Sequence, residues 1–265
     1  MVGTGDRPAR RDTSERRSQI SAMVRERGSV QVAALAAQFR VSMQTIRKDL
    51  HYLTELGVTA RAYGGAIAAE AVSPMLEPAV VTKLALHSAE KERIGRFAAS
   101  LVRAGDSIVL DSGTTTLQVA RHLPDLEGIT VVTNDFGVLA ALTQKTQIKI
   151  VMIGGELRRR NMAFYGAQTV GALNDLLVDK LFLGVDGFDL ERGITTHLEA
   201  EAMLNRKMTE VAREVIAVTD SSKFGRVCLH RIIGLNELTA LITDSGGKEF
   251  LASTGEDLGF DLYLV

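Results

Sequence analysis

The sequence predicts an α/β protein with a small, mainly helical N-terminal part and a larger domain built on a mostly parallel sheet. Three short amphipathic segments within residues 14–65 predict the helical part. Beyond residue 90, short apolar runs alternate with helical patterns, which favours a parallel sheet covered on both faces. Polar residues directly follow five of these runs, where the carboxyl ends of parallel strands meet in one crevice.

Composition and charge indicate where the protein acts and what kind of partner it meets. The chain is 46% hydrophobic and 24% charged, and no apolar run approaches the ~20 residues that span a bilayer. Its polar, basic start is unlike a secretory signal, and the single Cys228 forms no internal disulfide, so we expect a cytoplasmic protein outside the membrane. Residues 1–65 carry eleven Lys and Arg against six Asp and Glu, whereas the remainder is acidic. This asymmetry indicates that only the N-terminal part meets a polyanion.

The helical part has the spacing of a helix-turn-helix. A first helix places Ile20 and Val24 on one face, and a second is expected over Val32 to Phe39. Ser42 is a good N-cap for a third helix, which follows after only three or four residues. Arg40 stands where many such motifs have a turn glycine, a change of modest cost.

The outward residues of the third helix suit DNA. Gln, Thr, Arg and Lys near a helix N-terminus match the donors and acceptors of major-groove edges and the flanking phosphates. A solvated helix face is the competing interpretation for any one of them. After Gly57, a short alternating segment closes on Gly64-Gly65 and predicts a wing. The predicted DNA-binding residues are Ser42, Gln44, Thr45, Arg47, Lys48, His51, Tyr52 and Arg61.

The run Ser42-x-x-Thr45-Ile46-Arg47-Lys48-Asp49-Leu50, followed by Tyr63-Gly64-Gly65-Ala66, resembles the winged helix-turn-helix signature of the DeoR family of transcriptional regulators. The resemblance implies a DNA-binding domain over residues 14–69 and double-stranded operator DNA as its partner. Residues 70–89, Ala-rich with Pro74 and Pro78, are predicted to be a linker. Residues 90–265 then form the larger α/β domain.

The sharpest element of that domain is Asp111-Ser112-Gly113-Thr114-Thr115-Thr116, which follows the first strand. Glycine lets the backbone approach an anion, and the amides and hydroxyls after it lie at the positive end of a helix, an arrangement that suits a phosphate. Neither a Walker A loop nor a dinucleotide-binding loop is present, which disfavours nucleoside triphosphates and NAD. Ordinary turn chemistry explains any one loop, but five together favour a small polar ligand.

The same loops resemble the C-terminal sensor domain of the DeoR family, which implies a fold similar to ribose-phosphate isomerases and CoA transferases and a phosphorylated sugar as effector. Stretches such as Phe164-Tyr165-Gly166 and Thr196-His197 resemble members that repress N-acetylgalactosamine utilisation, which implies an N-acetylgalactosamine or galactosamine phosphate. The residues that the resemblance and the loops assign to this ligand are Asp111, Ser112, Gly113, Thr114, Thr115, Asn134, Gly155, Glu156, Asp186 and Lys223.

Two other classes compete with a repressor. A sugar-phosphate isomerase-like enzyme with an accessory DNA-binding part would use the carboxylates and Lys223 in acid–base chemistry. Turnover would destroy the signal that a DNA-binding sensor measures, so we expect a repressor and no enzyme. The five histidines stand far apart, which disfavours a metal site, and no cofactor is expected. A homo-oligomer would place two or more DNA-binding parts on one operator.

Overall fold

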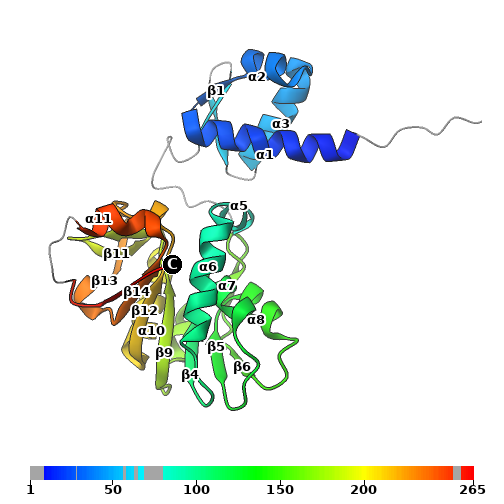
Figure 1. Ribbon diagram of the computed structural model, residues 1–265. Coiled ribbons are helices and arrows are strands. Elements are labelled where there is room, and N and C mark those ends of the chain that lie inside the picture. Colours follow the sequence, from blue (N-terminus) through cyan, green and yellow to red (C-terminus); the bar gives the residue numbers. More distant parts are fainter. Residues whose placement is uncertain (1–8, 28, 56–57, 63–64, 69–79, 253–257) are drawn as a thin grey trace, which may run out of the picture. The chain divides into compact units, whose positions relative to one another are not determined.

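The computed structural model describes residues 9–27, 29–55, 58–62, 65–68, 80–252 and 258–265 (Figure 1). The chain divides into two compact units, Met1–Thr82 and Lys83–Val265. Within the range predicted to be a linker, helix α5 spans Val80–Ala85 and helix α6 begins at Ser88.

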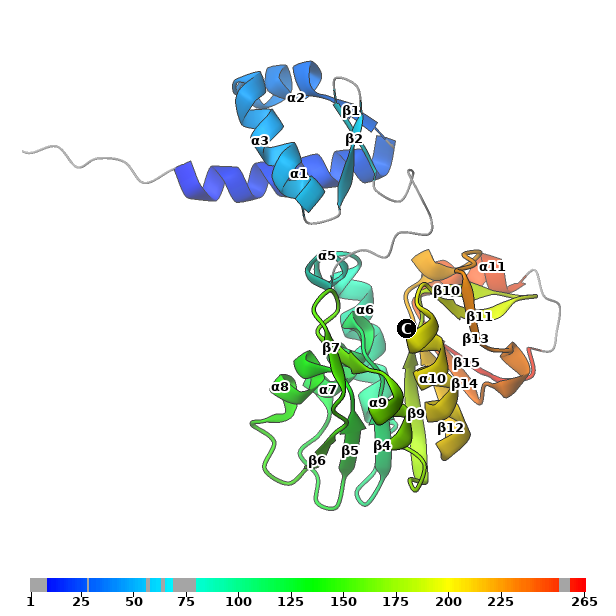
Figure 2. The ribbon, with the colours of Figure 1, turned by 180° about the vertical axis from the view of Figure 1, so that it is seen from behind.

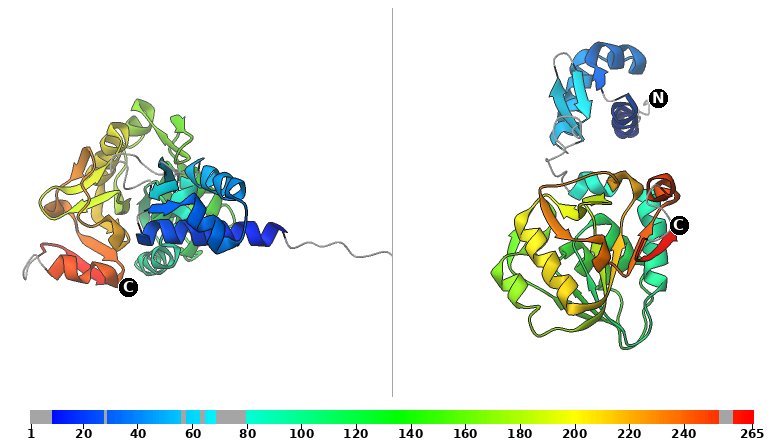
Figure 3. Two further views of the ribbon diagram at one scale, coloured as in Figure 1. Left: turned by 90° about the horizontal axis from the view of Figure 1, so that it is seen from above. Right: turned by 90° about the vertical axis from the view of Figure 1, so that its left-hand side faces the viewer.

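The first unit is a winged helix-turn-helix. Its three helices lie beside a small antiparallel sheet of strand order β1-β3-β2 (Figure 3). In chain order the elements are α1 (Ala9–Arg27), β1 (Ser29–Gln31), α2 (Val32–Phe39), α3 (Met43–Glu55), β2 (Thr59–Ala62) and β3 (Gly65–Ala68). The bounds of α2 and α3 and the hairpin of β2 with β3 confirm the predicted helix-turn-helix and wing.

Local chemistry explains the turn between α2 and α3. Arg40 adopts the left-handed conformation with φ 51°, so it takes the role of the usual turn glycine. Ser42 Oγ accepts a hydrogen bond of 3.1 Å from the Thr45 amide, which satisfies a donor in the first turn of α3. Ile20, Leu35 and Ile46 are buried in one core, as their helical spacing predicts.

The second unit is built on a seven-stranded sheet of strand order β15-β14-β12-β9-β4-β5-β6, in which every pair is parallel. This confirms the predicted parallel α/β architecture. The strands are β4 (Ser107–Leu110), β5 (Thr130–Thr133), β6 (Lys149–Met152), β9 (Val178–Gly184), β12 (Ala212–Val218), β14 (Ala240–Thr243) and β15 (Asp261–Leu264).

Helices cover both faces of this sheet (Figures 1 and 2). Alternate strand residues explain the two layers, because Ile108 and Leu110 pack with one core while Val109 packs with the other. The first core includes residues of α6 (Ser88–Ser100), α7 (Thr114–His122) and α8 (Phe136–Leu142). The second core includes residues of α9 (Ala167–Gly171) and α10 (Glu199–Val211), with α11 (Lys248–Ala252) further along the chain.

Two small sheets flank the main one. A hairpin pairs β7 (Glu156–Arg158) with β8 (Ala163–Tyr165), and a three-stranded sheet pairs β10 (Gly187–Asp189), β11 (Gly193–Thr196) and β13 (His230–Ile233). The sequence did not predict these strands, because none of the predicted apolar runs covers them.

The strand order determines where a ligand can bind. β4 is the first strand of the sheet in the chain, with β5 and β6 on one side and β9 and β12 on the other. The direction of winding therefore reverses between β4 and β9. In open α/β sheets, ligands bind at the carboxyl ends of the strands at such a switch point. Asp111 follows β4 and Asp186 follows β9, so both predicted ligand residues lie at this edge.

Candidate functional site

The first candidate site is the outer face of α3. Arg47 and Lys48 are exposed there, as are Gln44 and His51. Ser42 and Thr45 are engaged with each other at the start of the helix, where their hydroxyl oxygens lie 2.9 Å apart. The backbone of Arg61 lies in β2, and its side chain is outside the described residues.

A buried ion pair fixes α3 against α1. Asp49 accepts from Arg16 Nε at 2.7 Å and from Arg17 Nε at 2.8 Å, and its side chain is only 2% exposed. The Arg17 guanidinium also lies 3.9 Å from the centre of the Tyr52 ring. Tyr52 is half-exposed, so the structure assigns it a contact within the unit in addition to its predicted outward position.

The second candidate site begins at Asp111, directly after β4. Its carboxylate accepts from the Ser112 amide at 2.6 Å, from the Gly184 amide at 3.2 Å and from Asn205 Nδ2 at 3.3 Å. Burial raises the pKa of Asp111 to about 7, against the effect of the two amides. Asp111 therefore ties β4 to β9 and α10 at the switch point.

Gly113 and the threonines after it form the start of α7. Gly113 has φ 152°, a conformation that favours glycine, and it precedes the first residue of the helix. Thr114 and Thr115 are buried, and Thr116 Oγ1 bonds back to the Gly113 carbonyl oxygen at 2.9 Å. The first amides of α7 are thus presented at the same edge as Asp111, as anion binding requires.

Tyr165, at the end of β8, organises a polar cluster that sequence reasoning missed. Its hydroxyl oxygen lies 2.9 Å from Ser112 Oγ and accepts from Asn161 Nδ2 at 2.5 Å. Asn134 Nδ2 donates to the neighbouring Phe164 carbonyl oxygen at 2.9 Å. The carboxyl-edge cluster is defined here as Asp111, Ser112, Asn134, Asn161, Tyr165 and Asn205.

Buried acceptor atoms in this cluster indicate what it can bind. Among the described residues, the Oδ1 atoms of Asn134, Asn161 and Asn205 are buried and have no hydrogen-bond partner. A buried carbonyl oxygen without a donor is costly. A ligand that brings hydroxyl or amino donors would satisfy these atoms.

Gly155 and Glu156 differ in their placement. A side chain on Gly155 would meet Thr169 Oγ1 and the Tyr165 carbonyl oxygen, so its backbone packs closely against the β8 hairpin strand. Glu156 is exposed at the start of β7, opposite Tyr165 in the register. Gly155 therefore supports the cluster through its backbone, while Glu156 lies at the periphery.

A second group of charges surrounds Asp186. Lys83 Nζ donates to Asp186 Oδ1 at 2.8 Å, with both side chains largely buried. Burial alone would raise the pKa of Asp186, but Lys83 and Lys223 hold it well below its usual range. Lys91 Nζ donates to two backbone carbonyls, and burial lowers its pKa to about 8. We call Lys83, Lys91, Asp186 and Lys223 the lysine cluster.

Sequence reasoning missed Lys83, Lys91, Asn161, Tyr165 and Asn205. Lys83 lies in the range expected to be a linker, and Asn205 is in the middle of α10. None of the five follows a predicted strand, so the signal that found Asp111 and Asp186 was absent. The order of strands and loops in the sequence predicts which residues follow a strand and so lie at the carboxyl edge of the sheet. These five side chains reach that edge from other elements.

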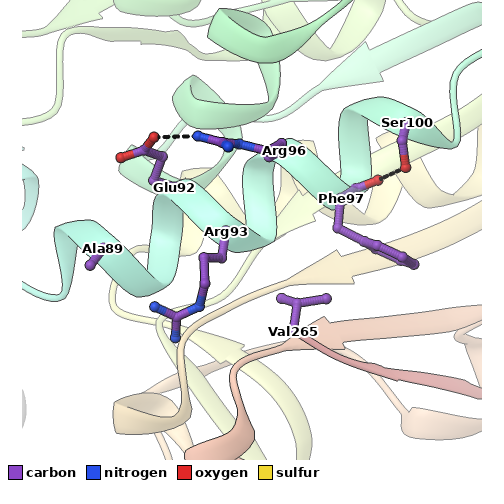
Figure 4. Close-up of a pocket in the computed structure, with 7 residues that line it drawn as sticks. All are labelled: Ala89, Glu92, Arg93, Arg96, Phe97, Ser100 and Val265. Atoms are coloured by element: carbon purple, nitrogen blue, oxygen red, sulfur yellow. Dashed lines mark hydrogen bonds and ion pairs between the residues drawn. The ribbon is translucent and has the colours of Figure 1, made fainter.

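Two pockets are lined by residues outside these two clusters. One, of about 540 Å³, is lined by α6 residues and the C-terminal Val265, and contains the ion pair of Glu92 with Arg96 (Figure 4). Another, of about 660 Å³, is lined by Leu117, Arg121 and residues of α8. Neither contains a residue predicted to bind the ligand.

The described part of the chain lacks two kinds of feature. It has no group of three or more His, Cys, Asp or Glu side chains placed to hold a metal ion. It also contains no helix with the length and hydropathy of a membrane span.

The raised pKa of Asp111 predicts a pH dependence that Asp111→Asn removes. Between pH 4 and 7 the folded protein keeps a proton on Asp111 that the unfolded chain has lost, so wild-type stability falls as pH rises through this window. The free energy of unfolding of Asp111→Asn, measured relative to wild type in urea, should therefore increase from pH 4 to pH 7 and then level off. A constant difference would contradict the burial argument.

Two family models match the chain. The DeoR-like helix-turn-helix domain matches residues 16–72, and the DeoR C terminal sensor domain matches residues 86–245. Of the solved structures, ribose 5-phosphate isomerase A from Methanocaldococcus jannaschii superposes with a TM-score of 0.38 and 19% identity, over 51% of this chain and 54% of its own.

Curated relatives cover most of the chain. A protein of Escherichia coli O157:H7, provisionally named an aga operon transcriptional repressor, is 46% identical over 88% of this chain and 87% of its own length. The HTH-type transcriptional repressor GlcR of Bacillus subtilis is 35% identical over 87% of this chain and 88% of its own. The glycerol-3-phosphate regulon repressor of Escherichia coli K12 is 32% identical over 88% and 91%.

Proposed function

Because this chain belongs to the DeoR family and is a transcriptional repressor of a sugar operon, we propose that a phosphorylated sugar bound at the carboxyl edge of β4 and β9 releases it from operator DNA. The observation that carries this proposal is the meeting of Asp111, the α7 N-terminus and Asp186 at the switch point of the parallel sheet. In this chain the unit with that edge follows the unit that matches the DeoR-like helix-turn-helix domain.

In the proposed complex, Ser112, Gly113, Thr114 and Thr115 hold the phosphate through amides, hydroxyls and the positive end of α7. Asp111, Asn134 and Asp186 then face the sugar, with Lys223 close by. Gly155 and Glu156 are assigned to the rim. The buried Oδ1 atoms of Asn134, Asn161 and Asn205 are acceptors, so they complement a polyol or an amino sugar, whose groups donate hydrogen bonds.

We further propose that the sugar is an amino sugar, as an N-acetylgalactosamine or galactosamine phosphate. The support is the relative named for the aga operon, which shares 46% identity over 88% of this chain. A pocket that hydrogen-bonds a substituent rejects the analogue lacking it, because buried partners are left unpaired. The discriminating ligands are therefore galactosamine 6-phosphate, its N-acetyl form and galactose 6-phosphate.

We propose that the outer face of α3 enters the major groove of the DNA and presents Gln44, Thr45, Arg47, Lys48 and His51 there. Ser42 and Tyr52 are proposed to border the groove. Arg61 is proposed to contact the DNA backbone from the wing. We propose a homo-oligomer that brings two first units to one operator, since linkage raises the effective concentration of the second unit. The ligand would favour an arrangement that no longer matches the half-site spacing.

Variants of each unit test whether operator binding and sugar-phosphate binding are separate activities. Arg47→Ala should weaken operator binding about tenfold, within the 1–3 kcal/mol expected for a base or phosphate contact, and leave sugar-phosphate binding unchanged. Thr114→Ala combined with Thr115→Ala should do the reverse. Gel-shift titration with DNA from upstream of the gene measures the first activity.

Thermal shift with the three sugar phosphates measures the second activity, because a ligand at about 100-fold its dissociation constant adds about 2.7 kcal/mol to stability. If both sets of changes reduced both activities equally, the assignment of the two units would be wrong. Conversion of a sugar phosphate by the purified protein would instead favour an enzyme.

A further inference from the structure

Lys83 and Lys91 of the lysine cluster lie at the start of the second unit, which follows the DNA-binding unit in the chain. Lys83 is the first residue of the second unit and belongs to α5, the first described element after residues 69–79. Its ammonium group reaches Asp186 at the carboxyl end of β9, across 103 residues of sequence. The first residue of the second unit is therefore attached directly to the proposed ligand site.

A second lysine holds the backbone of the same segment. Lys91 Nζ donates to the carbonyl oxygens of Lys83 at 2.6 Å and of Leu86 at 2.7 Å, from a side chain that is buried in α6. Leu84, between them, packs against the core beneath α6. Residues 83–86 are thus positioned through backbone carbonyls as well as through the Lys83 side chain.

Asp186 belongs to both the proposed ligand site and this attachment. The charges of Lys83, Lys223 and His197 act on its carboxylate, and Thr196 Oγ1 lies 3.4 Å from Oδ2. Asp186 is also close enough to Asp111 to affect its charge. A sugar hydroxyl or amino group that donates to Asp186 Oδ1 would therefore compete with Lys83 for that oxygen.

We propose that the Lys83–Asp186 ion pair couples ligand binding to DNA binding: it holds α5 in the ligand-free protein, and the bound ligand takes over Asp186 and releases α5. The inference rests on the proposed function and deepens it by naming the group that transmits the signal. A ligand shifts an equilibrium only through different contacts in the two states, and the ion pair supplies that difference.

The structure offers a matched control. Lys180 Nζ donates to Asp106 Oδ2 at the same 2.8 Å, with side chains 11% and 15% exposed, against 15% and 11% for Lys83 and Asp186. Lys180 and Asp106 lie towards the start of β9 and β4, at the opposite edge of the sheet. Lys83→Met and Lys180→Met each remove an ion pair of the same length and similar burial. Only Lys83→Met removes the ion pair that is proposed to couple ligand binding to DNA binding.

The experiment uses full-length protein and needs no ligand for its first arm. Lys83→Met should weaken operator binding about tenfold, a typical size for allosteric coupling, while Lys180→Met should stay within twofold of wild type. Hydrogen exchange should become faster at residues 83–91 in Lys83→Met alone. Equal operator affinities or equal exchange in the two variants would overturn the inference.

The second arm uses galactosamine 6-phosphate as the probe. Coupling is reciprocal, so a variant that already lacks the Lys83–Asp186 ion pair should bind the probe more easily. Lys83→Met should therefore bind the probe more tightly than wild type, by up to about tenfold. Weaker or unchanged probe binding in this variant would overturn the coupling. Absence of probe binding to wild type would instead contradict the proposed ligand, and absence of salt-sensitive DNA binding would contradict the proposed function.

Discussion

Replacing Asp49 by alanine is expected to lower the free energy of unfolding of the first unit by about 3–5 kcal/mol, the cost of leaving buried charges without their partner. Asp49 is 1% exposed and receives both Arg16 and Arg17 of α1. Without it, two guanidinium groups lie against α3 with no carboxylate to neutralise them. A loss of this size is comparable to the whole stability of a small domain, so operator binding should disappear.

Calorimetry of the full-length protein measures this effect, since the two units can unfold in separate transitions. The matched control is Glu15→Ala, which removes an exposed acid from the same helix α1. Surface changes of that kind usually alter stability by about 0.5 kcal/mol or less. If Asp49→Ala and Glu15→Ala had similar effects on the first transition, the ion pair would not be what holds α3 to α1.

The second large effect is expected for Gly95→Ala, at the contact of α6 with α7. A Cβ atom at Gly95 would lie 2.4 Å from Gln118 Cβ and 2.6 Å from the Gln118 backbone carbonyl carbon. Backbone cannot move aside cheaply, so the second unit should lose about 3 kcal/mol, the upper end of overpacking costs. This loss should exceed the gain of about 1 kcal/mol that alanine brings to a helix.

Gly171→Ala is the control, because Gly171 is likewise in a helix of the second unit, as the last residue of α9, and no atom lies within 4 Å of its added Cβ. Urea unfolding should place Gly95→Ala well below wild type and Gly171→Ala at or slightly above it. Gly95→Ala should also weaken binding of galactosamine 6-phosphate, since α7 carries Thr114 and Thr115 at its start. A stabilised Gly95→Ala would show that the two helices separate without cost.

Sequence reasoning succeeded where local chemistry decides. The predicted second helix, Val32 to Phe39, has the bounds of α2, because its apolar spacing, the left-handed Arg40 and the Ser42 cap all act within a few residues. The predicted strand Ser107–Leu110 has the bounds of β4, because its apolar run is also a local feature of the sequence. The hairpin of β7 with β8 escaped prediction because its residues follow no alternation, and only pairing with a partner makes them strands.

By itself, the sequence determined the two-part organisation, the winged helix-turn-helix, the alternation of strands and helices and the polar residues that end the strands. Hydrogen bonds and apolar spacing act over a few residues, so these features are local. Only the tertiary structure decided that β4 lies between β5 and β9, that Tyr165 and Asn205 join Asp111, and that Lys83 meets Asp186. Those contacts join distant residues, and the packing of the whole sheet selects them.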